Sequence, residues 1–90
     1  MSTQKIKVWL ALNFPYNHLR AVGILTGFKH VEMQRLIVSH HPQDVENMLV
    51  YFVEKYYMKH QSWFKMEEAL RTVGENLLAD RLSRKYANLC

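Results

Sequence analysis

The stretch from Ser62 to Leu82 constrains the fold of this chain more than any other, because it has the pattern of two helices joined by a glycine. The Ser62 hydroxyl can accept a hydrogen bond from a free backbone N–H, which makes it a sound N-cap. Gly74 offers a left-handed exit after the first helix. Apolar residues follow helical steps of three and four around it: Trp63, Met66, Leu70, Val73 and Leu77, and then Leu78 and Leu82. Two helices so closely joined must pack on each other or on a shared core.

Size and composition predict a single compact domain. The chain has 90 residues, of which 49% are hydrophobic, and only three glycines and two prolines, which argues against disorder. Its apolar runs are all shorter than the roughly 18 residues that span a membrane. We expect a cytoplasmic location, because the start lacks the apolar core of a secretory signal and the one cysteine, Cys90, has no partner for an internal disulfide.

The first half of the chain has weaker patterns. Residues 6–14 allow a strand or a short helix, and we expect a helix because no other segment offers a partner strand. Pro15 fits the first turn of a second helix over residues 16–25. That helix is expected to bury Leu19, Val22 and either Ile24 or Leu25, with Gly23 a weak point of about 1 kcal/mol, and to end at Thr26-Gly27.

A third helix is expected over residues 29–38 and a fourth after a break at residues 39–42. In the third helix, the residues expected to face the core are Val31, Met33, Leu36 and Ile37. Pro42 suits the first turn of the fourth helix, and Asp44 and Glu46 complement its dipole. The fourth helix has the clearest stripe in the chain: Val45, Met48, Leu49, Phe52, Val53 and Tyr56.

These segments predict an all-α fold, a six-helix antiparallel bundle occupying residues 1–90. Residues 59–61 are expected to connect the fourth and fifth helices, and residues 1–4 and 86–90 to be frayed. Val50, Tyr51 and Tyr57 lie off the main stripe of the fourth helix. Either other helices cover them, which we favour, or they lie at a partner interface, where tyrosine is enriched.

The net charge is +4 and unevenly distributed. Residues 1–31 carry four basic side chains and no acid, whereas acids slightly outnumber bases over residues 32–61. Such a division suits a contact between surfaces of opposite charge, although it also suits a simple solvated surface.

Patterns that indicate catalysis or metal binding are missing from the sequence. The histidines stand at 18, 30, 40, 41 and 60, without the spacing of a zinc site or a cysteine nearby. There is no nucleophile elbow, phosphate-binding glycine loop or paired-carboxylate motif, so we expect neither an enzyme nor a cofactor or metal. Glu67 and Arg71 stand at i, i+4, as in an ordinary surface ion pair.

Nucleic-acid binding is the alternative function. A basic helical domain of this size suits a helix-turn-helix module, whose recognition helix presents rows of Arg, Lys, Asn or Gln. Residues 31–38 offer Gln34 and Arg35, and the last helix offers Arg81, Arg84 and Lys85. These rows are sparse, and we therefore rank this function second.

The order and spacing of several short motifs resemble death domains, six-helix interaction modules of apoptotic and innate-immune signalling. The last two helices are similar in Trp63, Ala69-Leu70, Gly74, Leu78-Ala79 and Leu82. Earlier matches are Leu19, Val22, Leu25 and Gly27, and then Asp44, Met48-Leu49 and Phe52. The chain departs from the family in lacking the tryptophan usual early in the second helix and in its short, basic first segment.

The resemblance implies a protein-interaction module without a cofactor, whose partner is another death-domain protein. Such modules join different faces of neighbouring copies. On this chain the matching faces would be a basic one at Arg20, Lys29 and Arg35 and an acidic one at Asp44, Glu46 and Glu54. Further candidates near the loop after the fourth helix are Lys55, Tyr57 and Lys59.

Overall fold

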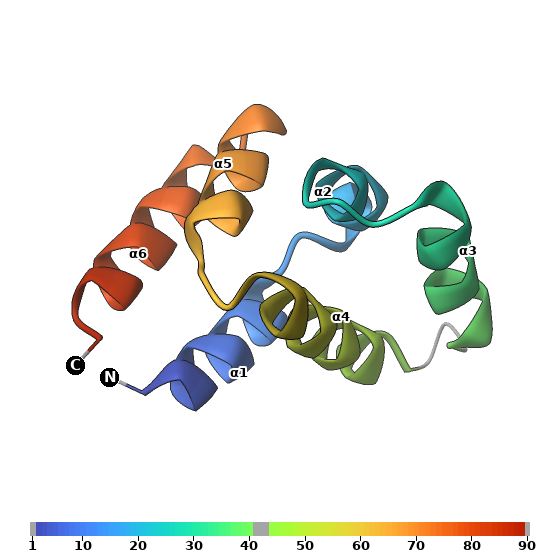
Figure 1. Ribbon diagram of the computed structural model, residues 1–90, viewed down its shortest axis with the longest axis horizontal. Coiled ribbons are helices and arrows are strands. Elements are labelled where there is room, and N and C mark those ends of the chain that lie inside the picture. Colours follow the sequence, from blue (N-terminus) through green and yellow to red (C-terminus); the bar gives the residue numbers. More distant parts are fainter. Residues whose placement is uncertain (1, 41–43, 90) are drawn as a thin grey trace.

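Six α-helices make up most of residues 2–40 and 44–89, the part of the chain that this computed structural model describes. In chain order they are α1 (Thr3–Asn13), α2 (Leu19–Leu25, after a 3-10 turn at Tyr16–His18), α3 (His30–Ser39), α4 (Val45–His60), α5 (Phe64–Thr72) and α6 (Asn76–Ala87). α4 packs on α1 and α3, α5 pairs with α6, and α2 joins α3 to α5 (Figure 1). The all-α prediction, including the helix over residues 6–14, is confirmed for these residues.

The stripe of α4 forms the centre of the core, as predicted. Five of its six residues are buried, and Val45 packs against the core in a half-buried position. Ile6 and Leu10 on α1 contribute from one side, and Met66 and Leu70 on α5 from another, all at 0% exposure. Burial of each such side chain stabilises the fold by roughly 1.5–3 kcal/mol.

Several predicted core residues are exposed instead. Val31 on α3 and Leu77 on α6 are more than half exposed, and neither Ile24 nor Leu25 on α2 is buried. α2 is only seven residues long and buries Leu19, Val22 and Gly23, with Thr26 just after it. Short helices present a narrow buried face, so an apolar residue one step off that face remains in water.

Two glycines end helices in the same way. Gly74 follows α5 with φ +87°; its N–H donates to the Arg71 carbonyl (3.0 Å) and the next N–H, of Glu75, to the Leu70 carbonyl (2.8 Å). Gly27 follows α2 with φ +97° and an equivalent pair of bonds. This is the Schellman arrangement, which satisfies carbonyls at a helix end and favours glycine because it lacks a Cβ. Both predicted helix ends are therefore confirmed.

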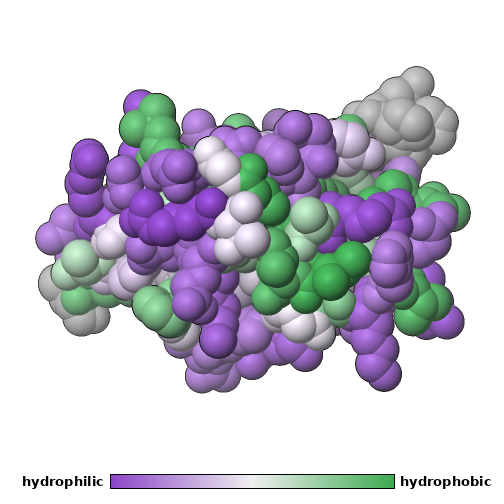
Figure 2. All heavy atoms as spheres, turned by 90° about the horizontal axis from the view of Figure 1, so that it is seen from above, coloured by the Kyte–Doolittle hydropathy of each residue, from purple (hydrophilic) through white to green (hydrophobic). Residues whose placement is uncertain are grey.

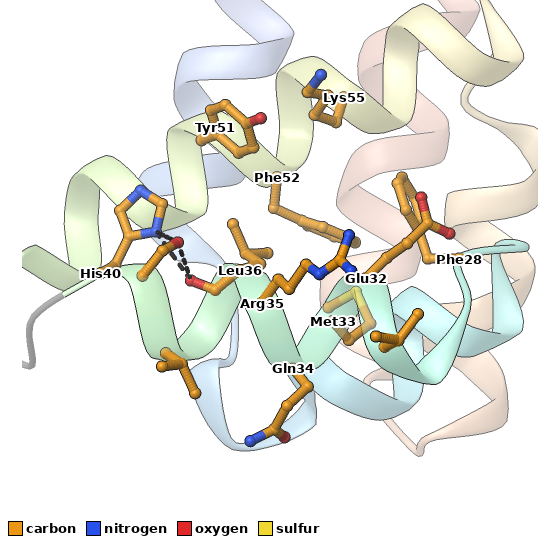
Figure 3. Close-up of a pocket in the computed structure, with 13 residues that line it drawn as sticks. Phe28, Glu32, Met33, Gln34, Arg35, Leu36, His40, Tyr51, Phe52 and Lys55 are labelled. Carbon is orange, nitrogen blue, oxygen red and sulfur yellow. Dashed lines mark hydrogen bonds between the residues drawn. The ribbon is translucent and has the colours of Figure 1, made fainter.

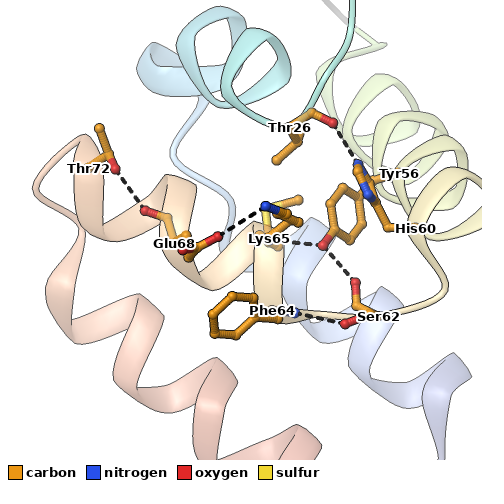
Figure 4. A network of polar contacts seen from close by, with 9 residues as sticks. Thr26, Tyr56, His60, Ser62, Phe64, Lys65, Glu68 and Thr72 are labelled. Atoms are coloured by element: carbon orange, nitrogen blue, oxygen red, sulfur yellow. Dashed lines mark hydrogen bonds and ion pairs between the residues drawn. The ribbon is translucent and has the colours of Figure 1, made fainter.

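The junction between α4 and α5 is held by the buried hydroxyl of Tyr56 (Figure 4). It donates to the Ser62 carbonyl (2.6 Å) and accepts from the Met66 backbone N–H (2.9 Å). The Ser62 hydroxyl accepts from the Phe64 N–H (3.2 Å), so Ser62 assists the start of α5 although the N-cap position is Trp63. α4 extends through His60, which means that two of the three residues expected to connect these helices are helical.

The α5–α6 hairpin is locked by polar side chains. Arg71 contacts Glu67 on its own helix and Asp80 on α6, both at 2.8 Å, and the Tyr86 hydroxyl donates to Glu67. α6 therefore continues through Tyr86 and Ala87, which we had expected to be frayed, and Leu89 packs on the core. At the other end, Thr3 and Gln4 belong to α1 rather than to a frayed tail.

The molecule is elongated, with extents of 36 × 23 × 22 Å, and α6 and α3 lie at opposite ends of its long axis (Figure 1). Seen from above, apolar atoms gather in patches among hydrophilic ones, most extensively in the half that carries α2 and α3 (Figure 2). In the described ranges no helix is long and apolar enough to cross a membrane. Pro42, expected in the first turn of α4, lies outside the described residues.

Candidate partner-binding groove

A hollow with a volume of about 810 Å³ runs between α3 and α4. We call it the α3–α4 groove. α3 supplies one wall and the middle of α4 the other, while the segment before α3 closes one end and His40 the opposite end (Figure 3). Its lining residues are Phe28, Val31, Glu32, Met33, Gln34, Arg35, Leu36, Val38, Ser39, His40, Tyr51, Phe52 and Lys55.

The floor of the groove is apolar. Phe52 is 1% exposed and packs against Phe28, with 5.4 Å between ring centroids, while Leu36 fills the space beside it. Above this floor, Tyr51 is 48% and Val31 51% exposed to water. Large apolar side chains on the walls of an open groove provide area that a partner can cover.

Cations surround this floor. Arg35 projects from α3 and Lys55 from α4, with the Lys55 ammonium 5.3 Å from the Tyr51 ring centroid. The Lys59 ammonium lies 5.7 Å from the ring of Phe28, the residue that precedes Lys29. The structure thus places two of the predicted site residues, Arg35 and Lys55, in the lining of the groove, and a third, Lys59, beside Phe28 at its end.

One carboxylate and one imidazole complete the lining. The Glu32 carboxylate accepts a hydrogen bond from the Lys29 backbone N–H (2.7 Å). This carboxylate therefore caps the N-terminus of α3. The His40 ring packs on Tyr51 at 5.8 Å, and its Nδ1 lies 2.9 Å from the Leu36 carbonyl oxygen, a contact that places the proton on Nδ1. Neither arrangement resembles an acid–base or nucleophile pair.

The other predicted site residues lie elsewhere. Arg20 is half-buried on α2 and does not line the groove. Tyr57 packs on Trp63 with ring centroids 4.9 Å apart, so one of the three off-stripe residues is covered within the domain as we favoured. The other two, Val50 and Tyr51, are 38% and 48% exposed, and the expectation of burial is wrong for them.

The predicted acidic face is partly used inside the molecule. The Glu54 carboxylate forms an ion pair with Lys7 on α1 (3.2 Å), and Asp44 accepts from the Asn47 amide (2.6 Å). Glu46 remains exposed in the first turn of α4. One of these three acids is therefore already matched by a cation of the same chain.

Charge pairing over the whole described region is lopsided. Only Lys7, Lys65 and Arg71 lie within 4.0 Å of a carboxylate, which leaves nine of the twelve Lys and Arg side chains without one in residues 2–40 and 44–89. Among the eight acids, in the same ranges, three lack a basic partner: Glu32, Asp44 and Glu46. The molecule thus presents many more unmatched cations than unmatched carboxylates.

Sequence reasoning found the cations of the groove but missed its floor. The floor joins Phe28 and Leu36 to Phe52 of α4, and only the packing of α3 on α4 brings these residues together. The one signal in the sequence was that Tyr51, which lies above this floor, is off the main stripe of α4. In the described part of the chain no group of three or more His, Cys, Asp or Glu is placed to hold a metal ion.

No protein-family model, curated protein or solved structure matches this chain.

Proposed function

We propose that this chain is a protein-interaction module that binds an acidic, amphipathic helix of a partner protein in the α3–α4 groove. By the sequence resemblance, it belongs to the death-domain type and recruits another death domain into an apoptotic or innate-immune signalling complex. The supporting observation is the combination, in one groove, of an apolar floor and a rim of cations that have no carboxylate partner among the residues the structure describes.

The shape of the groove suits a helix. Two packed helices form its walls and apolar rings its floor, which is the form of surface that receives the apolar face of an amphipathic helix. Tyr51 and Arg35 are residue types that dominate binding energy when a partner covers them. Both are exposed on opposite walls of the groove, so one helix seated between them would contact both.

The charges favour a partner other than a second copy. A copy of this chain offers at most three unmatched carboxylates to nine unmatched cations, counted over the described residues. A net acidic partner matches them better, and complementary charge raises both association rate and specificity. We therefore place the heterotypic interaction ahead of the homotypic one.

The test uses a fluorescein-labelled peptide with leucines at i, i+3, i+4 and i+7 and glutamates on its other face, followed by a panel of isolated death domains of different net charge. We expect anisotropy to detect peptide binding, and the acidic death domains to bind in preference to the basic ones. Tyr51→Ala should weaken both interactions about tenfold or more. Tyr16→Ala is the matched control, because Tyr16 has the same 48% exposure away from the groove.

Charge reversal separates this function from nucleic-acid binding. Arg35→Glu should weaken peptide binding, whereas Lys65→Glu on α5 should leave it unchanged. Normal binding by both Tyr51→Ala and Arg35→Glu would exclude the groove. Tighter binding to a DNA duplex than to any death domain, with affinity falling steeply as salt rises, would favour the alternative function.

A further inference from the structure

A second basic surface lies at the other end of the molecule, where α6 packs beside α1. A hollow of about 480 Å³ is lined by Trp9 of α1, by three residues of α6 (Arg81, Arg84 and Lys85) and by Asn88, the C-cap of α6. The α6 residues follow steps of three and four, so they share one helix face. The Lys85 ammonium lies 4.7 Å from the centroid of the Trp9 ring, which fixes the two helices' side chains against each other.

The three cations of this surface have no carboxylate within 4.0 Å among residues 2–40 and 44–89. Asp80, the nearest acid in the sequence, is bound to Arg71 on α5 instead. Arginine binds phosphate oxygens through two parallel N–H bonds, and two arginines and a lysine around one hollow form a suitable site for phosphate groups.

The neighbouring face of α1 adds exposed apolar area. Val8 is 45% and Leu12 60% exposed, and together with Lys5 and the half-buried Trp9 they follow the spacing of one helical face. The core-facing residues of α1, Ile6 and Leu10, point elsewhere and are fully buried. An apolar stripe therefore borders a basic one, with an amphipathic tryptophan between them.

We propose that this α1–α6 surface docks on an anionic lipid bilayer. Arg81, Arg84 and Lys85 bind lipid phosphates, while Val8 and Leu12 enter the boundary between headgroups and acyl chains. Trp9 lies at the level where tryptophan is enriched in membrane proteins, with an apolar ring and a polar N–H. Lys5 adds a further cation on the α1 side.

The apolar stripe favours a bilayer over a nucleic acid. A phosphate backbone can satisfy the cations, yet it would leave Val8 and Leu12 in water, whereas a bilayer accommodates both kinds of side chain. The surface also lies at the opposite end of the long axis from α3 (Figure 1), so membrane docking and occupation of the α3–α4 groove are compatible. The proposal is independent of which protein binds in that groove.

The experiment is co-sedimentation of the full chain with phosphatidylcholine vesicles that contain or lack phosphatidylserine. We expect binding only with the anionic lipid and a loss of binding as salt is raised. Trp9 fluorescence should shift to the blue, because Trp63 is already buried. Each cation near such a surface is worth on the order of fivefold in affinity, so the double variant Arg81→Gln/Arg84→Gln should bind about 25-fold more weakly.

Leu12→Ser distinguishes the lipid from other phosphate ligands. It should weaken vesicle binding, while the groove variant Tyr51→Ala should not, and circular dichroism should show that each remains helical. Absence of binding to the anionic vesicles at low salt would overturn the proposal. So would binding of a single-stranded or duplex oligonucleotide that needs the arginines but is unaffected by Leu12→Ser, since the apolar stripe would then have no role.

Discussion

The side chain of Met33 lies directly against the α-carbon of Gly23: a Cβ at position 23 would stand 2.3 Å from the Met33 sulfur and 2.5 Å from its terminal methyl. This contact joins α2 to α3, and Met33 is itself only 1% exposed. The glycine that weakens α2 as an isolated helix is therefore the residue that lets α3 approach it. Because the wall of the α3–α4 groove is α3, the contact also positions the candidate site.

We predict that Gly23→Ala destabilises the domain, although alanine is the better helix former by about 1 kcal/mol. The added methyl forces Met33 out of its place in a packed core, where overpacking costs about 1–3 kcal/mol. Urea unfolding followed by circular dichroism measures the net change. A more stable Gly23→Ala variant would show that Met33 moves aside at no cost.

A double-mutant cycle tests whether Met33 is the cause. Met33→Ala alone should cost about 2–5 kcal/mol through the cavity that it creates. In the Met33→Ala background, Gly23→Ala should become neutral or stabilising, since the methyl then has space and only the gain in helix propensity remains. Simple additivity of the two changes would contradict the contact.

The parts of the fold that the sequence predicted correctly depend on local patterns. The α4 stripe extends over three turns with its large residues on one face, and Gly27 and Gly74 each lie at a helix end that requires positive φ. The errors fall on apolar residues beside the buried face of a helix, such as Val31 on α3 and Leu77 on α6. In α2, both alternatives, Ile24 and Leu25, are exposed, whereas Thr26, just after the helix, is buried. Its hydroxyl donates to the Val22 and Gly23 carbonyls, so a polar residue is buried without loss.

The candidate site was half predictable. Charge identified Arg35, Lys55 and Lys59, but their common position along one groove depends on the packing of α3 on α4. Residues 20 or more apart in sequence meet at this groove. The periodicity of one helix does not predict which residues of another helix it contacts. Likewise, the use of Glu54 by Lys7 required the contact between α1 and α4.

At Trp63, we predict that stability depends on the aromatic ring and not on the indole N–H. Its Nε1 is buried without a hydrogen-bond partner in the described region, while its ring stacks on Tyr56 at 5.8 Å. Trp63→Ala should cost about 3–5 kcal/mol. Trp63→Phe should cost far less, within about 1.5 kcal/mol, because it keeps an aromatic ring and removes a donor whose burial costs about 1–3 kcal/mol. Thermal melts of both variants measure the difference, and equal destabilisation would exclude this explanation.

Tyr56 predicts a loss of stability in alkali. Burial raises the pKa of its hydroxyl to about 12 from an ordinary 10, against hydrogen bonds that lower it. The folded state thus favours the neutral hydroxyl. The resulting contribution to the free energy of unfolding is complete below pH 10 and is lost as the pH rises from 10 to 12. This contribution amounts to about 2–3 kcal/mol. Unfolding by urea at several pH values should show the decline, and Tyr56→Phe should abolish that part of it.

For Glu67, we predict a loss of stability as the pH falls, the opposite direction from Tyr56. The hydrogen bond from Tyr86 is the main cause of a lowered pKa for its carboxyl, with Arg71 contributing as well. A lowered folded-state pKa stabilises the protein above the ordinary carboxyl pKa, and that contribution is lost as the pH falls through the lowered value. Tyr86→Phe should therefore be less stable than the parent at pH 7, with a difference that shrinks below pH 4. A difference that stays constant down to pH 2 would refute the linkage.

The Lys7–Glu54 pair predicts which acids of α4 serve the fold and which are free for a partner. Glu54→Lys places a second cation beside Lys7, which already lies 5.0 Å from the Tyr57 ring centroid, and should lower stability by about 1 kcal/mol. Glu46→Lys, on the exposed first turn of the same helix, should change stability by less than half as much. If α4 also offers an acidic face to a partner, Glu46→Lys should weaken that binding with only this small effect on the melt. Any effect of Glu54→Lys on binding should follow its effect on folding. Melting curves and binding curves for the two variants decide between these roles, because a purely structural acid changes both together and a partner-facing one changes binding alone.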